Sequence, residues 1–493
     1  MRIGIIGGGI AGLAAAYELE KARAVGRPVE YTLYEARPRL GGTLASQIVD
    51  GAVLEQGPDS FLTEKAAAAE LCRELGLGAE LLPSNDAARK TFIVVKNRLV
   101  PLPDGLMFLV PTRLWPTATT RLFSLRTKIR MGLELLHPPR AGDGDESVAS
   151  LVARHYGAEA VDRLADPLLS GIYGGDSAQL SARTVLPRLV EMERTYGSLT
   201  RGMLAAHRKM RAAAKDSSKA PKSGASIFTA LRGGMQQLVD ALAARINPAW
   251  VRTGAPVDAI EMTAHGWRVK SSEAKEDYDA LIVALPAWAA GALLGEVDAE
   301  LGAELSAIPY SSSITVSLVY DERKIGQLPE GFGFLVPASE GRAMLACTFA
   351  HRKFLGRTPP GKAVLRAFLG GPRQEFGQES GRESLLAESD EALVATVRRE
   401  LGEILGPVVL DARTEPEHKL VSRWPRAMVQ YAVGHKERID RIRTRVASLS
   451  GLRLVGNAYD GIGIPDCIRL GRQAARKQIS ELAGQRVGPA AGR

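Results

Sequence analysis

Three glycines near the start of the chain, Gly7, Gly9 and Gly12, have the spacing of a dinucleotide phosphate site. In such a G-x-G-x-x-G pattern the first glycine permits a tight turn, the second lets backbone amides approach a pyrophosphate, and the third lets a helix pack on a strand. Glu35 follows the last glycine at about the 20-residue offset where an acidic side chain accepts hydrogen bonds from an adenosine ribose. The pattern therefore favours a dinucleotide site over a glycine turn without a ligand.

The flanking sequence predicts the elements that position these glycines. Residues 3–6 are apolar and β-branched, which is typical of a strand buried on both faces, and residues 13–19 continue as a helix. Residues 29–34 predict a second strand that ends at Glu35. The helix start would offer unpaired N–H groups and partial positive charge to the phosphates.

Length and composition bound the function classes. A chain of 493 residues with 45% hydrophobic and 24% charged residues indicates two or three globular domains. The net charge of +9 favours an anionic partner, which could be nucleic acid, an anionic membrane surface or a polycarboxylate substrate. No apolar run approaches the roughly 18 residues that span a bilayer. We expect a soluble or peripheral protein.

Metal, hydrolase and phosphoryl-transfer chemistry find no support in the sequence. The three cysteines are far apart, which implies neither a disulfide framework nor a thiolate metal site and fits a reducing cytosol. HExxH, GxSxG and P-loop motifs are absent, and the seven histidines are scattered without ligand spacing. We expect no metal, and we expect a cofactor to carry the reaction.

Several blocks resemble one family of flavoproteins. Residues 35–43 resemble the extension by which the amine-oxidase superfamily brings a basic residue and a Gly-Gly pair back to the phosphates, so the expected dinucleotide is FAD rather than NAD. Residues 57–61, Gly-Pro-Asp-Ser-Phe, resemble a signature of the protoporphyrinogen/coproporphyrinogen oxidases that lies close to the flavin. Residues 166–176 and 456–467 resemble two further blocks of that family.

The resemblance implies an α/β fold with a Rossmann-like FAD-binding domain of the amine-oxidase/p-hydroxybenzoate-hydroxylase type, an α+β substrate domain and an inserted all-helical domain. The expected FAD-binding domain comprises residues 1–88, 227–293 and 425–486, and the substrate domain comprises 89–105 and 294–424. Residues 106–205 would be the helical domain, 206–226 a mobile loop and 487–493 a disordered tail. The loop is rich in lysine but has no aromatic residues for base stacking, so nucleic acid is not an expected partner.

The resemblance also implies which residues contact a non-covalently bound FAD. Cys467 falls inside a helix start, unlike the cysteine that some amine oxidases join to the cofactor. The expected contacts are Gly7, Gly9, Ile10, Ala11, Gly12, Glu35, Ala36, Arg37, Gly41, Gly42, Thr43, Gly57, Pro58, Asp59, Ser60, Val257, Trp424, Gly456, Asn457, Gly461, Gly463 and Ile464.

The implied reaction is the six-electron oxidation of a porphyrinogen, with dioxygen reoxidising the flavin to give hydrogen peroxide. Some family members pair a substrate propionate with an arginine where this chain has Thr91, so Arg89 and Lys90 become the candidates, together with Asp59. This departure favours coproporphyrinogen III, a tetrapyrrole with four propionates. The alternatives are protoporphyrinogen IX, an amine substrate, and a peripheral membrane or nucleic-acid binding protein with a vestigial flavin fold.

An amphipathic segment, residues 121–136, carries Leu122, Leu125, Ile129, Leu133 and Leu136 on one helical face. Such a stripe usually faces a hydrophobic core, and we expect it to do so here. The alternative is a basic helix lying on an anionic membrane, since the family's helical domain is membrane-associated in some members. We therefore expect a cytoplasmic protein that could sit peripherally on the inner membrane face.

Overall fold

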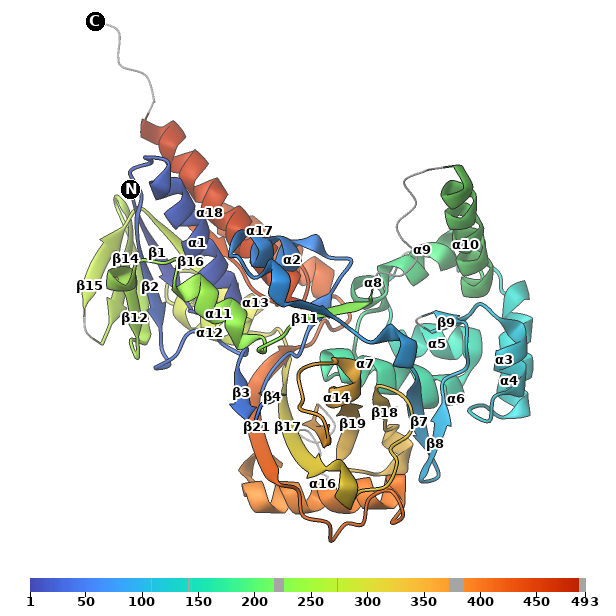
Figure 1. Cartoon of the computed structure of the whole chain (residues 1–493). Helices are drawn as coiled ribbons and strands as arrows, with labels where there is room; N and C mark the ends of the chain where they lie inside the picture. The colour runs from blue at the N-terminus through green and yellow to red at the C-terminus, as the bar shows by residue number, and fades with distance from the viewer. Residues whose placement is uncertain are drawn as a thin grey trace, which may run out of the picture.

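The computed structural model describes residues 1–486 except 108, 141, 143, 217–225, 273 and 372–384. Figure 1 shows three regions: a parallel sheet flanked by long helices, a large mixed sheet, and a group of helices at one side. The predicted disordered tail, 487–493, lies outside the described residues.

A parallel sheet of five strands, in the order β12-β2-β1-β16-β22, forms the centre of the first region. Its strands are β12 (Val251–Thr253), β2 (Glu30–Glu35), β1 (Arg2–Ile6), β16 (Ala280–Val283) and β22 (Leu452–Leu454). Because they come from three distant parts of the chain, this sheet is complete only when the last of those parts has joined it. The predicted Rossmann-like fold is confirmed.

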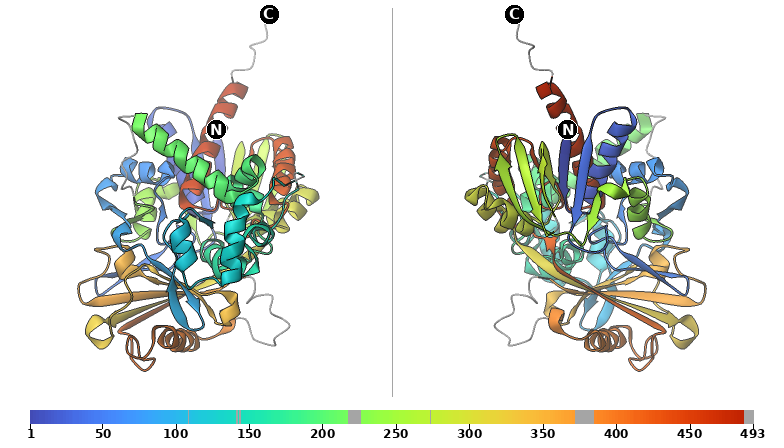
Figure 2. Two further views of the ribbon diagram at one scale, coloured as in Figure 1. Left: turned by 90° about the vertical axis from the view of Figure 1, so that its right-hand side faces the viewer. Right: turned by 90° about the vertical axis from the view of Figure 1, so that its left-hand side faces the viewer.

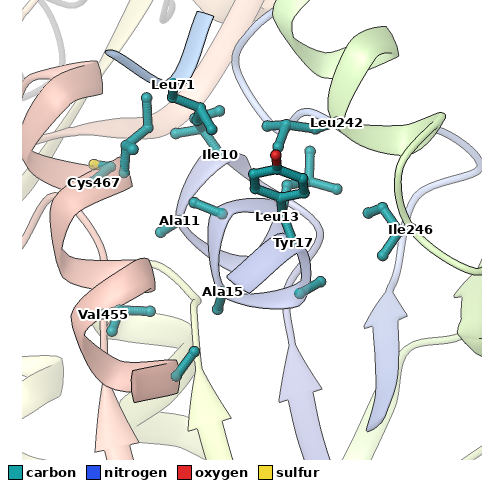
Figure 3. Packing of buried hydrophobic residues seen from close by; sticks show 14 of the residues in the cluster. Ile10, Ala11, Leu13, Ala15, Tyr17, Leu71, Leu242, Ile246, Val455 and Cys467 are labelled. Carbon is teal, nitrogen blue, oxygen red and sulfur yellow. The ribbon is translucent and has the colours of Figure 1, made fainter. Parts of the chain in front are cut away.

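Helix α1 (Ile10–Ala24) packs on this sheet beside helix α18 (Ile464–Arg486), and its first ten residues are all buried. Figure 3 shows Leu13, Tyr17 and Ala15 of α1 surrounded by side chains from α2 (Ala66–Glu74), α11 (Gln236–Ala243) and the chain around α18. A Cβ at Gly471 would lie 2.1 Å from the Ala11 carbonyl oxygen, so glycine is required where α18 approaches α1.

The mixed sheet has seven strands in the order β21-β17-β20-β19-β18-β7-β8. All neighbouring strands are antiparallel except β18 and β7, which are parallel. Helix α16 (Asp390–Leu405) packs Leu393, Val397 and Leu401 against one face (Figure 1). The strands are β7 (Thr91–Val95), β8 (Arg98–Pro101), β17 (Tyr310–Asp321), β18 (Gly333–Leu335), β19 (Met344–Phe349), β20 (Lys362–Gly370) and β21 (His418–Val429).

Smaller elements link and flank the strands of the two sheets. The strands are β3 (Ser46–Val49), β4 (Ala52–Glu55), β5 (Phe61–Leu62), β6 (Leu81–Pro83), β11 (Phe228–Leu231), β13 (Val257–Thr263), β14 (Gly266–Ser271) and β15 (Lys275–Tyr278). The helices are α12 (Ala287–Leu294), α13 (Ala299–Ser306), α14 (Ala350–Lys353) and α17 (His435–Ser448).

The third region, called the helical domain here, comprises α3 to α10 and has its own hydrophobic core (Figure 2, left). Between α6 and α7 the helix widens into a π-helical turn over Val161–Ala165. The α-helices are α3 (Leu114–Thr119), α4 (Leu125–Leu133), α5 (Val148–Tyr156), α6 (Ala158–Ala160), α7 (Asp166–Tyr173), α8 (Ala182–Val185), α9 (Pro187–Tyr196) and α10 (Leu199–Asp216). Two short strands precede them, β9 (Leu106–Met107) and β10 (Val110–Pro111).

The prediction of a mobile loop over 206–226 is wrong for its first part, because α10 continues to Asp216. Residues 207–216 are mainly alanine, lysine, arginine and methionine, which are among the strongest helix formers, so the helix continues through this basic segment. Residues 217–225 lie outside the described residues.

The prediction that the leucine stripe of residues 121–136 faces the core is wrong for four of its five residues. Leu122 is buried, but Leu125, Ile129, Leu133 and Leu136 are 73%, 56%, 61% and 78% exposed. Helix α4 packs inward through Thr127 and Met131 instead, which are 6% and 3% exposed. Periodicity correctly identified one face of the helix, but it carries no information about which face is covered.

Candidate functional site

The three glycines of the first turn serve different physical purposes. Gly7 has φ of +109°, and a Cβ there would lie 2.5 Å from the Ala284 carbonyl oxygen. A Cβ at Gly12 would lie 1.9 Å from the Gly7 carbonyl oxygen, so this glycine allows α1 to pack closely on the turn. A Cβ at Gly9, by contrast, would meet no atom within 4 Å. Protein packing thus accounts for Gly7 and Gly12 but not for Gly9, which borders open space at the N-terminus of α1.

Glu35 and the Gly41–Gly42 pair lie beside this turn. The Glu35 carboxylate accepts hydrogen bonds from the Gly8 N–H at 2.8 Å and the Arg37 N–H at 2.9 Å. The Gly41 N–H donates to the Gly8 carbonyl at 2.8 Å. The extension over residues 35–43 therefore returns to the glycine turn, as expected from the resemblance.

Loop 57–60 packs on the same extension. A Cβ at Gly57 would lie 1.8 Å from the Thr43 carbonyl oxygen, so the two backbones are in direct contact. Asp59 forms an ion pair with Lys353 at 2.8 Å and accepts a hydrogen bond from Ser60 at 2.6 Å. Burial alone would raise the pKa of Asp59, but Lys353 and Arg366 outweigh it and hold the pKa well below its usual range. Asp59 is thus an anion already engaged with this chain's own cations.

Sequence reasoning missed the basic residues that hold this loop. Arg366 donates to the Gly57 carbonyl, and Arg357 donates to the Asp59 carbonyl and pairs with the Glu55 carboxylate. Both arginines are about 95% buried. With Lys353 they come from a short stretch of α14 and β20, some 300 residues beyond the loop. Only a pattern of pairing between distant positions could have revealed them.

The C-terminal glycine loop, residues 456–463, lies between β22 and α18 and is called the C-terminal loop here. Gly456 and Gly461 have φ of +140° and +114°. The Asp466 carboxylate accepts from the Gly463 N–H at 3.3 Å and pairs with Lys65 at 2.6 Å. Because Lys65 lies three residues after β5, this ion pair links the start of α18 to the region of residues 57–62.

The remaining predicted contacts lie around these loops. The chain leading into Val257 is bonded to the extension, since the Ala255 N–H donates to the Glu35 carbonyl at 3.0 Å. Trp424 is 8% exposed and donates from Nε1 to the Gln56 carbonyl at 2.8 Å, directly before Gly57. Asn457 donates from Nδ2 to the Ala427 carbonyl, and Cys467 is a free, buried thiol.

Arg89 and Lys90, the predicted substrate contacts, are exposed at the entrance to β7. The Lys90 carbonyl accepts from the Phe332 N–H at 2.8 Å, so the backbone here is fixed to the loop before β18. The preceding Asn85 N–H donates to the Lys353 carbonyl at 2.9 Å, which places this segment next to the partner of Asp59.

A second charged group lies in the helical domain, behind α4. His155 is fully buried and bonds Glu134 at 2.9 Å through Nδ1 and Glu193 at 3.2 Å through Nε2. Burial would lower the pKa of His155, but the two carboxylates raise it. Burial would raise the pKa of Glu193, but His155 and Arg154 outweigh it and lower the pKa to about 2.

This group also contains the one His/Glu arrangement with ligand spacing among the described residues: His137, His155 and Glu193 offer atoms within 4.8 Å of one another. The histidines are therefore less scattered than their positions in the sequence indicated. Both His155 nitrogens already face carboxylates, and Arg154 lies 2.7 Å from Glu193. The arrangement is that of a buried imidazolium held by two carboxylates.

The first site has the parts that an FAD molecule requires: a phosphate turn with open space at Gly9, an acid beside it, and glycine loops from two further segments. Among the described residues, no helix is long and apolar enough to cross a bilayer.

Comparisons with known proteins agree with this geometry. Residues 10–478 match the family model described as flavin containing amine oxidoreductase. The chain is 34% identical to a Bacillus subtilis protein named coproporphyrinogen III oxidase, over 97% of this chain and 98% of that one. It is 33% identical to the human protein named protoporphyrinogen oxidase, over 96% and 97% of the two chains. It superposes with a TM-score of 0.83 on a crystal structure of a putative protoporphyrinogen oxidase from Exiguobacterium sp. 255-15, at 33% identity over 97% and 99% of the chains.

Proposed function

The chain belongs to the flavin containing amine oxidoreductases and, within them, to the porphyrinogen oxidases, and from this premise we propose that it oxidises coproporphyrinogen III to coproporphyrin III. It is an FAD-dependent oxidoreductase. The observation that carries the choice of substrate is the nearly full-length similarity to several bacterial proteins that bear this substrate in their names.

The proposed reaction removes six electrons and six hydrogens from the macrocycle in three rounds. The bound flavin would supply the electron acceptor for each two-electron round, and three dioxygen molecules would leave as three molecules of hydrogen peroxide. Over the three rounds and the tautomerisations between them, the four methylene bridges lose one hydrogen each and two pyrrole nitrogens lose one each, so the product is fully conjugated. Tautomerisation lets the ring present each new hydrogen at the same position.

In this proposal the protein's own residues bind and orient the cofactor and the substrate. We propose that the glycine turn receives the diphosphate, since Gly9 leaves room there and the N–H groups of α1 face it. Loop 57–60 is fixed in position by bonds from the side chains of Lys353, Arg357 and Arg366. Arg89 and Lys90 are exposed cations that suit propionates, and a substrate with four carboxylates agrees with the net charge of +9.

Steady-state assays test this proposal. Purified holoprotein is supplied with coproporphyrinogen III, protoporphyrinogen IX or a polyamine, while porphyrin fluorescence and peroxide are followed. We expect the highest kcat/KM with coproporphyrinogen III, three peroxides per porphyrin and no peroxide with the amine. Faster oxidation of protoporphyrinogen IX would instead support the second candidate, which the human and Exiguobacterium relatives favour by name.

We further propose that the helical domain rests on an anionic membrane surface. The exposed apolar residues of α4 are joined by Trp115 of α3, which is 78% exposed. Arg121 and Arg126 are exposed close to this stripe, so an apolar face has a cationic border. Such a combination is attracted to anionic lipid and buries its apolar face at the headgroup boundary.

Vesicle sedimentation tests the membrane proposal. We expect the protein to pellet with vesicles containing phosphatidylglycerol, to bind more weakly as salt is raised, and to stay in solution with pure phosphatidylcholine. Equal binding to both vesicles, or none to either, would contradict it. Three buried free cysteines agree with a reducing, cytoplasmic side of that membrane.

A further inference from the structure

We infer that Tyr431 is a positioning residue through which the helical domain sets the conformation of the C-terminal loop, residues 456–463. The inference rests on the FAD dependence of the proposed function, but not on the identity of the substrate. It assigns to the helical domain a role in cofactor binding in addition to its exposed surface.

The side chain of Tyr431 bridges the two ends of the C-terminal loop. Its hydroxyl donates to the Asn457 carbonyl at 2.6 Å and accepts from the Gly461 N–H at 3.1 Å. The residue is only 4% exposed, so water does not compete for these bonds. Gly461 has a positive φ of +114°, a backbone conformation that glycine adopts readily. The Tyr431 hydroxyl therefore links Asn457 to Gly461 across the loop.

The ring is held in place by its neighbours. It stacks on the imidazole of His435, with centroids 4.3 Å apart, and contacts the ring of Tyr173 at 6.2 Å. Tyr173 is the last residue of α7 in the helical domain. Because both neighbours constrain the ring, the position of the hydroxyl is fixed before any cofactor binds.

The main chain around Tyr431 is bonded to the helical domain. The Ser181 N–H donates to the Tyr431 carbonyl at 2.7 Å, and the Val433 N–H donates to the Gln179 carbonyl at 3.0 Å. The Asp145 carboxylate accepts from the Gly434 N–H at 3.2 Å and from the Ser181 hydroxyl at 2.7 Å. The backbone of Tyr431 is thus hydrogen-bonded to the helical domain, and its hydroxyl is hydrogen-bonded to the C-terminal loop.

This arrangement predicts a measurable coupling. If the hydroxyl holds the loop ready for FAD, removing it leaves a loop that must be ordered during binding, and affinity falls. If the helical domain holds Tyr431 in place, a change at Asp145 lowers affinity through the same bond. Both changes would then act through the same hydrogen bonds of Tyr431. The loss of FAD affinity in the double variant should therefore be smaller than the sum of the two single losses.

The experiment measures FAD affinity of the apoprotein by quenching of flavin fluorescence, and thermal unfolding of the apoprotein in parallel. For Tyr431→Phe, which keeps the ring and removes both hydrogen bonds of the hydroxyl, we expect the dissociation constant of FAD to rise about tenfold. Tyr156→Phe is the matched control. Its hydroxyl is equally buried and contacts Thr200 at 3.2 Å inside the helical domain, so it should lower the unfolding temperature without changing FAD affinity.

Asp145→Ala supplies the second variant and remains informative if Tyr431→Phe does not fold. Alone it should raise the FAD dissociation constant several-fold, and added to Tyr431→Phe it should raise it little further. The inference is overturned if Tyr431→Phe binds FAD like the natural chain, or if Asp145→Ala has no effect or the same effect in both backgrounds. A failure of coproporphyrinogen oxidation with intact FAD coupling would contradict the proposed function alone.

Discussion

Helices α1 and α4 use their apolar side chains in opposite ways. In α1, Leu13 and Leu19 are fully buried because the helix is enclosed by the parallel sheet, α11 and α18. In α4, Ile129 and Leu133 are more than half exposed, and the helix is held by Met131 and by the cap that Ser124 provides at its N-terminus. The first helix therefore stabilises the fold, whereas the apolar residues of the second are available to something outside the chain.

The largest expected effect comes from making the same change in both helices. Leu13→Ala should lower the free energy of unfolding by about 3 kcal/mol, because it leaves a cavity in a closed core. Leu133→Ala in α4 should change it by no more than about 0.5 kcal/mol. Chemical denaturation of both variants measures the difference. Similar losses would mean that α4 is not an exposed helix in solution.

The next effect separates two glycines at the N-terminus of α1. Gly9→Ala should leave apoprotein stability almost unchanged, because its Cβ meets no protein atom, but should weaken FAD binding by about 1–3 kcal/mol through overpacking against the phosphates. Gly12→Ala should destabilise the apoprotein itself, since its Cβ would strike the Gly7 carbonyl. Calorimetry of FAD binding and thermal unfolding of the apoprotein distinguish the two outcomes. Normal FAD affinity in Gly9→Ala would argue against a diphosphate at this turn.

A third effect concerns pH and should be confined to the helical domain. The raised pKa of His155 contributes stability that is complete below about pH 6.5 and is lost as pH rises through the folded value. The lowered pKa of Glu193 contributes stability that is present above about pH 4.5 and is lost as pH falls toward about 2. The stability of this domain should therefore be greatest between these limits.

Hydrogen exchange of α5 and α9 across this pH range checks that expectation, with α1 as the internal reference. His155→Gln removes the imidazolium and should cost about 1–3 kcal/mol while abolishing the decline at alkaline pH. An unchanged alkaline decline in that variant would mean that another group titrates.

The smallest effect on stability should come from Ile129→Ser combined with Leu133→Ser, within about 0.5 kcal/mol per site. The same variant should lose binding to anionic vesicles, because about half of the exposed stripe on α4 becomes polar. Met262→Ser, at a residue 60% exposed on β13, is a matched control that should bind vesicles normally. Retained vesicle binding by the double variant would remove α4 from the membrane proposal.

Local patterns predicted the parts of the fold that depend on neighbouring residues. The turn at Gly7 and the acid at Glu35 beside it follow from sequence over short distances. Which face of α4 is buried could not be predicted, because it depends on which other elements of the fold cover the helix. The cations that hold loop 57–60 and the hydroxyl of Tyr431 were also missed, because tertiary contacts between remote segments create those roles.

The order of strands in the parallel sheet constrains how the protein is made in a cell. Its edge strand β22 and the packing helix α18 are translated long after β1 and α1, although all four elements belong to the same domain. At roughly 5–20 residues per second, a ribosome needs about 20–90 seconds to travel between them. During that interval the apolar surface of α1 lacks its partner helix α18, so the nascent chain should depend on holding chaperones, and the flavin can be captured only after α18 has been translated.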